Sequence, residues 1–530
     1  MHKRQLPLLD RMGSQFRAGN GNGPGRYPAI HGATMAAAAM LACACGGGGS
    51  GGSSPPAPPP PAPSTIQVSG PSTLAPSCGL AVGNAAAPPP EAFALNSAVQ
   101  PQLAANPANP LLLYGVFEQD RWNAIGARAI SFSGSKDGGV SWSAVSALPF
   151  SVCGGSAGPG AAYDRASDPS IAVGPSGILY ASALAFNAAG FQAAGGSSAV
   201  LVSRSTDGGA TWQAPTAVIG DVGASPGPYV FNDRDAIAAD PHGPDVYLLW
   251  DQISSDTAAS MPTYLAHSGD GGATWPAAKI IYQPGSGYQT LNNQPLVLPN
   301  GHVVDVFTVE LVFSFGGPQQ LVAIRSTDHG ATWLPNPGVV IAQMAPVGTA
   351  NPIASGAPIR DSAYMAQTAV DPSSGTLAAV WQDGSPSGGV RDGIVLSLSH
   401  DEGATWSTPV QVNSVPSVAA FDPTVHFGSN GRIAVTYYDF RDYVSGSTTL
   451  STGLWLRESA DGGATWTEKR LYGPFDLNTA ARADLIVGQT GNALFLGDQQ
   501  GLAWTGAAWA ALFAATTTQG SGVFAGVMPP

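Results

Sequence analysis

The stretch Ser205-Thr206-Asp207-Gly208-Gly209-Ala210-Thr211-Trp212 decides the fold, because the chain contains six versions of it. All six fit the pattern Ser-x-Asp-x-Gly-x-[Ser/Thr]-Trp, and successive copies begin 58 to 73 residues apart. Their fixed acidic residues are Asp137, Asp207, Asp270, Asp328, Asp401 and Asp461. One signature per unit at such a period indicates a repeat architecture.

Each octet has the chemistry of a tight turn between two strands. An Asp side chain in a turn accepts hydrogen bonds from backbone N–H groups just downstream. The Gly two residues later tolerates positive φ at little steric cost. The Trp then begins a new strand and buries its ring between layers. We therefore interpret the six acidic residues as structural.

The octet resembles the Asp-box, or BNR, repeat of the sialidase superfamily. The resemblance covers roughly residues 97–513 and implies a β-propeller. It also implies that the boxes lie on the face away from the active site. Asp-boxes recur in propellers that are not sialidases, so the resemblance indicates the fold more strongly than the activity.

Composition supports an all-β chain and excludes several functions. Only 10% of the 530 residues are charged, whereas the chain has 68 Gly and 46 Pro, which suits many short strands joined by turns. The net charge is −13 without a Lys/Arg-rich block, which argues against nucleic acid as a partner. The eight histidines are scattered. We expect no metal, no cofactor and a monomer.

The N-terminal region predicts export. Residues 1–45 combine a basic part, the short apolar segment 35–42 and small residues at the end, which are the parts of a signal peptide. Residues 46–64 are a Gly/Ser/Pro-rich tether. A cysteine at this junction resembles a lipoprotein signal. Cys45 is the candidate for lipidation, with Cys43 as its rival and plain cleavage as the alternative. We expect an outer-membrane or cell-surface lipoprotein, or else a periplasmic or secreted protein, with no membrane contact beyond the lipid anchor.

Two cysteines remain, Cys78 and Cys153. Export makes disulfide chemistry available, and two cysteines have one possible pairing. The sequence therefore predicts a disulfide between the N-terminal arm and the loop after the first unit.

Residues 65–530 divide into seven units. Each of the first six has short β-rich runs that precede or follow a box, while residues 497–527 offer three further runs without a box. We predict a seven-bladed β-propeller of four-stranded antiparallel blades, in which residues 65–69 supply the outer strand of the last blade. Closure removes exposed sheet edges. The alternative is a six-bladed ring with a C-terminal extension.

The ligand face is predicted from topology. If the boxes join third and fourth strands, the opposite face carries the starts of first strands and the ends of second strands, and loops on a rigid scaffold usually carry function. By analogy with sialidases, the predicted catalytic residues are Asp233, Asp235, Glu310, Tyr437 and Tyr438. The predicted substrate-binding residues are Arg234, Arg360, Arg441, Asp168, Trp250, Asp383 and Asp439.

Two functions remain open at this point. In the first, the chain is a sialidase-like glycoside hydrolase of the exo-α-sialidase type, with three arginines that bind the sugar carboxylate and a tyrosine nucleophile. In the second, it is a propeller that binds a glycan or a protein without catalysis. The Arg-Ile-Pro signature of sialidases is absent before the first box, which favours the second function.

Overall fold

The structure is a computed structural model that describes residues 64–78, 93–187, 197–222, 230–312, 319–484, 492–518 and 520–530. All of these belong to the unit Pro60–Pro530. The predicted export segment and nearly all of the tether lie outside the described residues. Among the described residues, no helix has the length and apolar character needed to cross a membrane.

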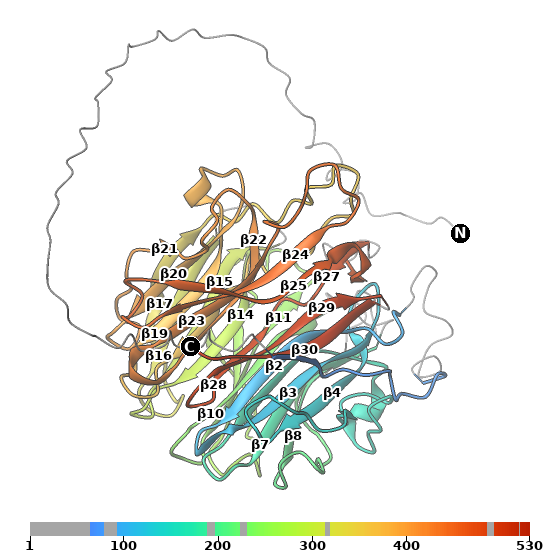
Figure 1. The fold of residues 1–530 in the computed structure, drawn as a ribbon. Coiled ribbons are helices and arrows are strands. Elements are labelled where there is room, and N and C mark those ends of the chain that lie inside the picture. Colours follow the sequence, from blue (N-terminus) through green and yellow to red (C-terminus); the bar gives the residue numbers. More distant parts are fainter. Residues whose placement is uncertain are drawn as a thin grey trace, which may run out of the picture. The chain divides into compact units, whose positions relative to one another are not determined.

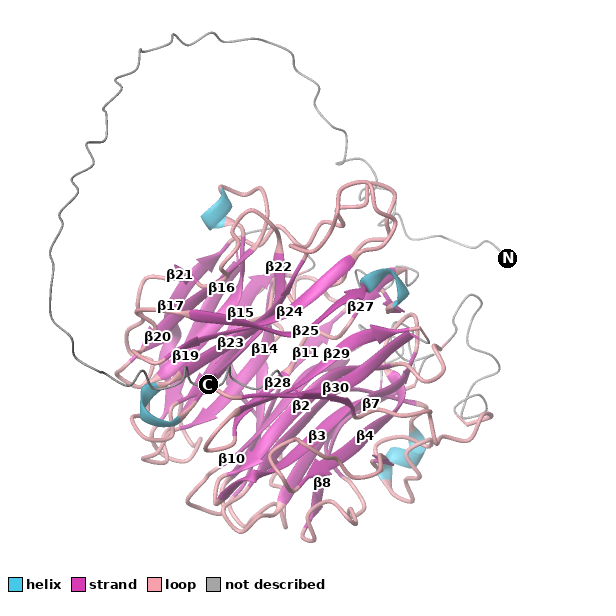
Figure 2. Cartoon of the chain, in the orientation of Figure 1, coloured by secondary structure: helices cyan, strands magenta, loops and turns pink. Residues whose placement is uncertain are grey.

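The described chain is all-β, and Figure 2 shows helix only as short turns. The strands form four-stranded antiparallel sheets in which neighbours in sequence are neighbours in space. The first two sheets are joined by one pair of residues, Ala127 and Ala166. Their strands are β2 (Ala98–Asn106), β3 (Asn109–Arg121), β4 (Ala127–Ser135), β5 (Ser146–Ala147), β6 (Arg165–Val173), β7 (Leu179–Phe186), β8 (Ser197–Ser205) and β9 (Thr216–Val222).

Four further sheets repeat this plan, and many of their strands can be followed in Figure 1. The third and fourth contain β10 (Val230–Ala239), β11 (Val246–Ser254), β12 (Thr263–Ser268), β13 (Lys279–Tyr282), β14 (Tyr288–Val297), β15 (Val303–Leu311), β16 (Gln319–Ser326) and β17 (Leu334–Met344). The fifth and sixth contain β18 (Gln367–Val370), β19 (Leu377–Asp383), β20 (Gly393–Ser399), β21 (Val410–Gln411), β22 (Ala420–Phe427), β23 (Ile433–Asp439), β24 (Ser451–Ser459) and β25 (Thr467–Asp476).

The last four-stranded sheet joins the two ends of the described chain. It contains β28 (Gly501–Trp504), β29 (Trp509–Thr517), β30 (Gly520–Met528) and, as its outer strand, β1 (Ser64–Gln67), which pairs antiparallel with β30. A separate hairpin, β26 (Ala481–Ala483) with β27 (Ala493–Phe495), lies in the connection between the sixth and last sheets. The single turns are η2 (Pro159–Ala162), η4 (Ser385–Ser387), η5 (Ser429–Gly431) and η6 (Leu477–Thr479).

The first strands of successive sheets contact one another. These contacts run from β2 to β6, β10, β14, β18, β22 and β28, and β28 contacts β2. The core lies mainly between the sheets: for example, Phe132 on β4 packs edge-on against Trp212 of the following sheet, with ring centroids 5.3 Å apart. First strands from distant parts of the sequence are thereby held side by side.

Each octet forms the same local network at the end of a third strand. In the second copy, the Ser205 hydroxyl donates to Asp207 (2.7 Å) and accepts from the Gly209 N–H (2.9 Å). The Asp207 carboxylate also accepts from the backbone and hydroxyl of Thr211, at 2.9 and 2.5 Å. These four contacts recur in all six copies. The acidic residues therefore act within their own turns.

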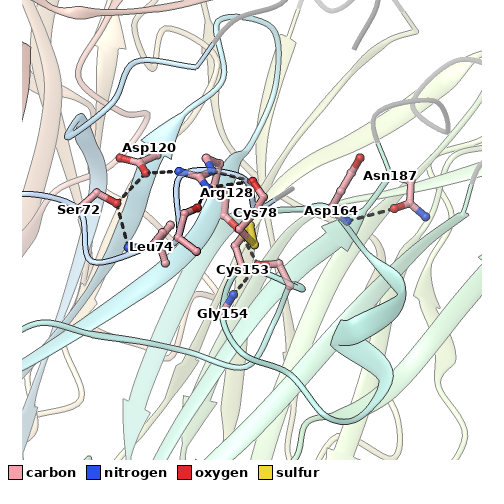
Figure 3. The surroundings of a disulfide bond; sticks show 11 residues. Ser72, Leu74, Cys78, Asp120, Arg128, Cys153, Gly154, Asp164 and Asn187 are labelled. Atoms are coloured by element: carbon pink, nitrogen blue, oxygen red, sulfur yellow. Dashed lines mark hydrogen bonds and ion pairs between the residues drawn. A yellow bond between two sulfur atoms is a disulfide. The ribbon is translucent and has the colours of Figure 1, made fainter. Parts of the chain in front are cut away.

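The N-terminal arm is fastened to the first two sheets by a disulfide between Cys78 and Cys153, which confirms the predicted pairing (Figure 3). Beside it, Arg128 donates to the Cys78 carbonyl at 2.9 Å and pairs with Asp120 at 2.9 Å. Both members of this ion pair are fully buried, and the Ser72 hydroxyl of the arm donates to the same Asp120 carboxylate. These contacts hold residues 72–78 in place.

Candidate functional site

Several first strands carry a β-bulge at the same level. The pairing register shifts within β2, β6, β10, β14 and β22, and each shift contains one non-glycine residue with φ between +47° and +62°. These residues are Gln100, Asp168, Arg234, Asn292 and Asp422. A bulge re-aims a side chain, and a left-handed conformation is costly for a residue with a side chain. The repeated bulge brings polar side chains from different sheets to one level.

Five charged residues form what we call the central cluster: Asp168, Asp233, Arg234, Arg360 and Asp498. Nη2 of Arg234 lies 2.7 Å from Oδ2 of Asp498, and Nη2 of Arg360 lies 2.9 Å from the same oxygen. Arg234 is also 4.0 Å from Asp168, which accepts a 2.6 Å hydrogen bond from Gln100. The cluster thus joins residues of β6 and β10 with the loops before β18 and β28, and Gln100 adds a contact from β2.

The cluster is largely buried. The Arg234 and Asp168 side chains are each 13% exposed and the Arg360 side chain is 19% exposed, whereas Asp498 is 1% exposed. The carboxylate that joins the two arginines is therefore more enclosed than the arginines themselves.

The loop after β27 positions Arg360 and Asp498. The Arg360 backbone N–H donates to the Leu494 carbonyl (3.0 Å), and its guanidinium lies 4.8 Å from the Phe495 ring centre. Gly497 has φ +118°, and a Cβ there would lie 2.4 Å from the Gln100 Cα. Only glycine permits this close approach, which sets the position of the next residue, Asp498.

Burial and charge shift the carboxyl pKa values in opposite directions. Burial alone would raise the pKa of Asp498, but the charges of Arg360 and Arg234 outweigh it and hold the pKa well below its usual range. Burial raises the pKa of Asp233 to about 6, against the charge of Arg234 and with the help of the Asp168 charge. The cluster thus contains a firmly ionised carboxylate and a carboxyl that is protonated in mildly acidic solution.

Glu310 lies near the cluster but is enclosed. Its two oxygens accept hydrogen bonds from the Gln289 and Gln319 side chains at 2.5 and 2.8 Å, and Glu310 is 1% exposed. Burial raises its pKa to about 7, although both amides and the Arg234 charge oppose the rise. Because Glu310 is enclosed, we expect it to interact with Arg234 through its charge and not to contact a ligand.

Arg441 is not part of this cluster, so the expected convergence of three arginines is wrong. It donates from Nη1 to Glu468 on the outermost strand β25 (2.6 Å) and from Nε to Asp439 (2.7 Å). Its guanidinium carbon lies 3.7 Å from the centre of the Trp455 ring. Asp439 also accepts from the Trp455 indole, so both predicted substrate-binding residues, Arg441 and Asp439, belong to a network within the sixth sheet.

The two tyrosines also do not fit the predicted catalytic role. Tyr437 is fully buried and donates to Glu468, and burial followed by Glu468 raises its pKa above the usual range. Tyr438 is 1% exposed and donates to the Ala514 carbonyl on β29. Both hydroxyls are held in their protonated form, whereas a nucleophile needs activation.

Three further predicted residues are not members of the central cluster. Trp250 is fully buried, and its indole donates to Asn232 (3.1 Å). Asp383 accepts from the Trp381 indole (3.1 Å) and the Ser385 N–H (2.8 Å). Asp235 is 6% exposed, and burial raises its pKa well above the usual range. Their side chains are enclosed, although their strand positions had suggested otherwise.

Sequence reasoning missed Asp498, which joins the two arginines, and Gln100, which holds Asp168. Both lie near the start of a first strand, where the predicted ligand face begins. Within the described residues, no group of three or more His, Cys, Asp or Glu side chains is arranged to hold a metal ion.

No protein-family model and no curated protein matches the chain. Among solved structures, the chain is similar to a protein of unknown function from Dyadobacter fermentans, with 17% identity, a TM-score of 0.42, and coverage of 69% of this chain and 94% of that one. It is also similar to an α-L-arabinanase from Penicillium chrysogenum in complex with arabinobiose (16%, 0.42, 69% and 93%). A third is an intramolecular trans-sialidase from Ruminococcus gnavus (14%, 0.40, 66% and 90%). These similarities are too low to assign an activity, so function rests on the side chains.

Proposed function

We propose that this chain is a carbohydrate-active β-propeller that hydrolyses glycosidic bonds at the central cluster. The observation that carries the proposal is the pair Asp233 and Asp168, two acidic residues on neighbouring first strands with different surroundings. Asp233 is partly exposed with a pKa raised to about 6, whereas Asp168 accepts a hydrogen bond from Gln100 and lies 4.0 Å from Arg234. Two neighbouring acidic residues with different surroundings are what glycoside hydrolysis requires.

The roles follow from these surroundings. Protonated Asp233 donates its proton to the oxygen of the leaving group as the glycosidic bond breaks. The Asp168 carboxylate stabilises the positive charge that develops on the sugar ring or activates the incoming water. Arg234 lies 4.0 Å from Asp168 and, by its own charge, keeps the Asp233 pKa from rising further.

The experiment is a panel of fluorogenic glycosides that spans hexosides, pentosides, uronides and sialosides. We expect wild type to release the fluorophore from at least one class. Asp233→Asn and Asp168→Asn should each lose at least 100-fold in kcat, while Asp439→Asn, in the separate Arg441 network, should keep the wild-type rate. Equal rates for wild type and Asp233→Asn would remove the proposed acid.

The hydrolysis of sialic acids is the narrower form of this proposal, and binding without hydrolysis is its alternative. Sialoside cleavage needs arginines available to a ligand carboxylate, and Arg234 and Arg360 are the two that lie together. Both already donate to Asp498, which argues against sialoside cleavage and leaves neutral glycans as the broader candidates. A glycan microarray with the same proteins separates binding from turnover.

We further propose that the seven four-stranded sheets are the blades of a closed propeller. The contacts between first strands, which return from β28 to β2, support this arrangement, as does the pairing of β1 with β30. Removing residues 64–69 should then destabilise the last sheet, and protease cleavage near the C-terminus would report it.

Export and lipidation at Cys45 are also proposals, supported by a disulfide of the kind found in oxidising compartments. Metabolic labelling with palmitate should mark the wild-type protein in a bacterial host, and Cys45→Ala should lose the label. Retention of the label in that variant but not in Cys43→Ala would move the site to Cys43. Analytical ultracentrifugation of the protein without its N-terminal lipid tests whether it is a monomer, as expected.

A further inference from the structure

The two arginines of the central cluster are already bound to a carboxylate of the chain itself. Arg234 and Arg360 approach the same oxygen of Asp498 at 2.7 and 2.9 Å, and Nε of Arg360 lies 3.4 Å from the other oxygen. This is how two guanidinium groups would hold the carboxylate of an acidic sugar. Asp498 therefore occupies the position that such a ligand needs.

Asp498 is not free to move aside. Its side chain is 1% exposed, and the preceding Gly497 lies directly against the Gln100 backbone. The following Gln499 donates to the Pro169 carbonyl (3.1 Å) and accepts from Gln102 (2.7 Å). With both neighbours fixed, Asp498 remains beneath the arginines when a ligand approaches.

The charge around the arginines also disfavours an anion. Two guanidinium groups are surrounded by Asp498, Asp168 and Asp233, and the enclosed Glu310 is close enough to Arg234 for their charges to interact. The two positive charges therefore already face carboxyl groups of the chain itself. An added carboxylate would meet like charge in a partly buried site, where water screens poorly.

We propose that the central cluster accepts uncharged sugars and excludes sugars that carry a carboxylate, and that Asp498 is the residue that sets this specificity. The inference rests on the proposed carbohydrate function and defines its substrate class. Asp498 acts through Arg234 and Arg360, so it is a specificity-determining residue and not a catalytic one. Its removal should expose two guanidinium groups to an acidic ligand.

The test compares wild type with Asp498→Asn, which keeps the shape of the side chain and removes its charge. The probes are a glycan microarray of neutral, uronate-terminated and sialylated glycans, and matched fluorogenic glucoside and glucuronide substrates. We expect wild type to bind neutral glycans and Asp498→Asn to gain at least tenfold in affinity for acidic ones. Asp439→Asn is the matched control, because it removes one carboxylate partner from an arginine outside the cluster and should leave the preference for neutral glycans unchanged.

Each outcome decides between the two proposals. Wild-type binding of acidic glycans as strong as that of neutral ones would overturn this inference and leave the carbohydrate function standing. A folded Asp498→Asn protein without a gain for acidic glycans would overturn the role of Asp498. If wild type neither binds nor hydrolyses any of the glycans, both the proposed function and this inference are wrong. If Asp498→Asn fails to fold, the preference of wild type alone supports the inference or overturns it.

Discussion

Gly497→Ala tests whether the close approach of two first strands positions the central cluster. The new Cβ would lie 2.4 Å from the Gln100 Cα and 2.5 Å from the Gln100 nitrogen, and both are backbone atoms that cannot move alone. The residue would also keep φ near +118°, which costs about 1–3 kcal/mol for a residue with a side chain. Overpacking adds about 1–3 kcal/mol. We therefore expect a loss of about 2–6 kcal/mol in the free energy of unfolding.

The matched control is Gly520→Ala. Gly520 has φ +115°, almost the same as Gly497, but a Cβ there would have no neighbour within 4 Å. This variant carries the conformational cost without the collision, so it should be less destabilising than Gly497→Ala by about 1–3 kcal/mol. Urea unfolding followed by tryptophan fluorescence measures both. Equal unfolding midpoints for the two variants would refute the idea that β28 and β2 are in close contact at this point.

Four other predictions concern the site and its scaffold. The raised pKa of the Asp233 carboxyl stabilises the folded protein below the unfolded pKa, and this contribution is lost as pH rises through about 6. Asp233→Asn should therefore unfold at a higher urea concentration than wild type at pH 7 and at the same concentration at pH 3.5. A lower urea midpoint for the variant at pH 7 would contradict the raised pKa. Ser135→Ala should lose about 1–3 kcal/mol in urea unfolding, because the buried Gly139 N–H loses its acceptor; an unchanged midpoint would disprove the role of the turn network. Cys78→Ser/Cys153→Ser should lose about 4 kcal/mol, since the disulfide closes a loop of 75 residues, and wild type in reductant should match it. Tyr437→Phe should leave glycoside turnover unchanged, and a 100-fold loss in kcat would restore this tyrosine as a catalytic candidate.

The repeat and its strands could be predicted because their information is local. The octet contains within eight residues every group that its turn needs, so six copies establish the spacing of the sheets. The last sheet lacks an octet, yet its runs could be recognised from β-rich sequence at residues 497–527. The pairing of β1 with β30 follows from the need to cover an edge.

The bulges of the first strands could have been predicted from prolines in the sequence. Pro101, Pro169 and Pro423 each follow the left-handed residue of a first strand. A proline inside a strand is typical of a bulge, since it cannot donate to the ladder. The signal gives the location of the bulge but not the partner of the re-aimed side chain.

The assignment of individual site residues depended on information that the sequence does not hold. The role of Asp498 could not be predicted, because its arginine partners lie 264 and 138 residues away in the sequence. Arg441 follows the end of a second strand, as expected, but Glu468 and Trp455 on the outer strands hold it there. Strand position therefore grouped Arg234 and Arg360, which lie together, with Arg441, which lies in a separate network.

The pairing of β1 with β30 has a consequence for synthesis. Gln67 pairs with Phe524, so the N-terminal strand has no partner until 457 further residues have been made. At about 5–20 residues per second, this takes roughly 20–90 s on the ribosome. The last sheet therefore cannot be completed before β30 has been synthesised, and a message truncated before β30 leaves β1 without the strand it pairs with.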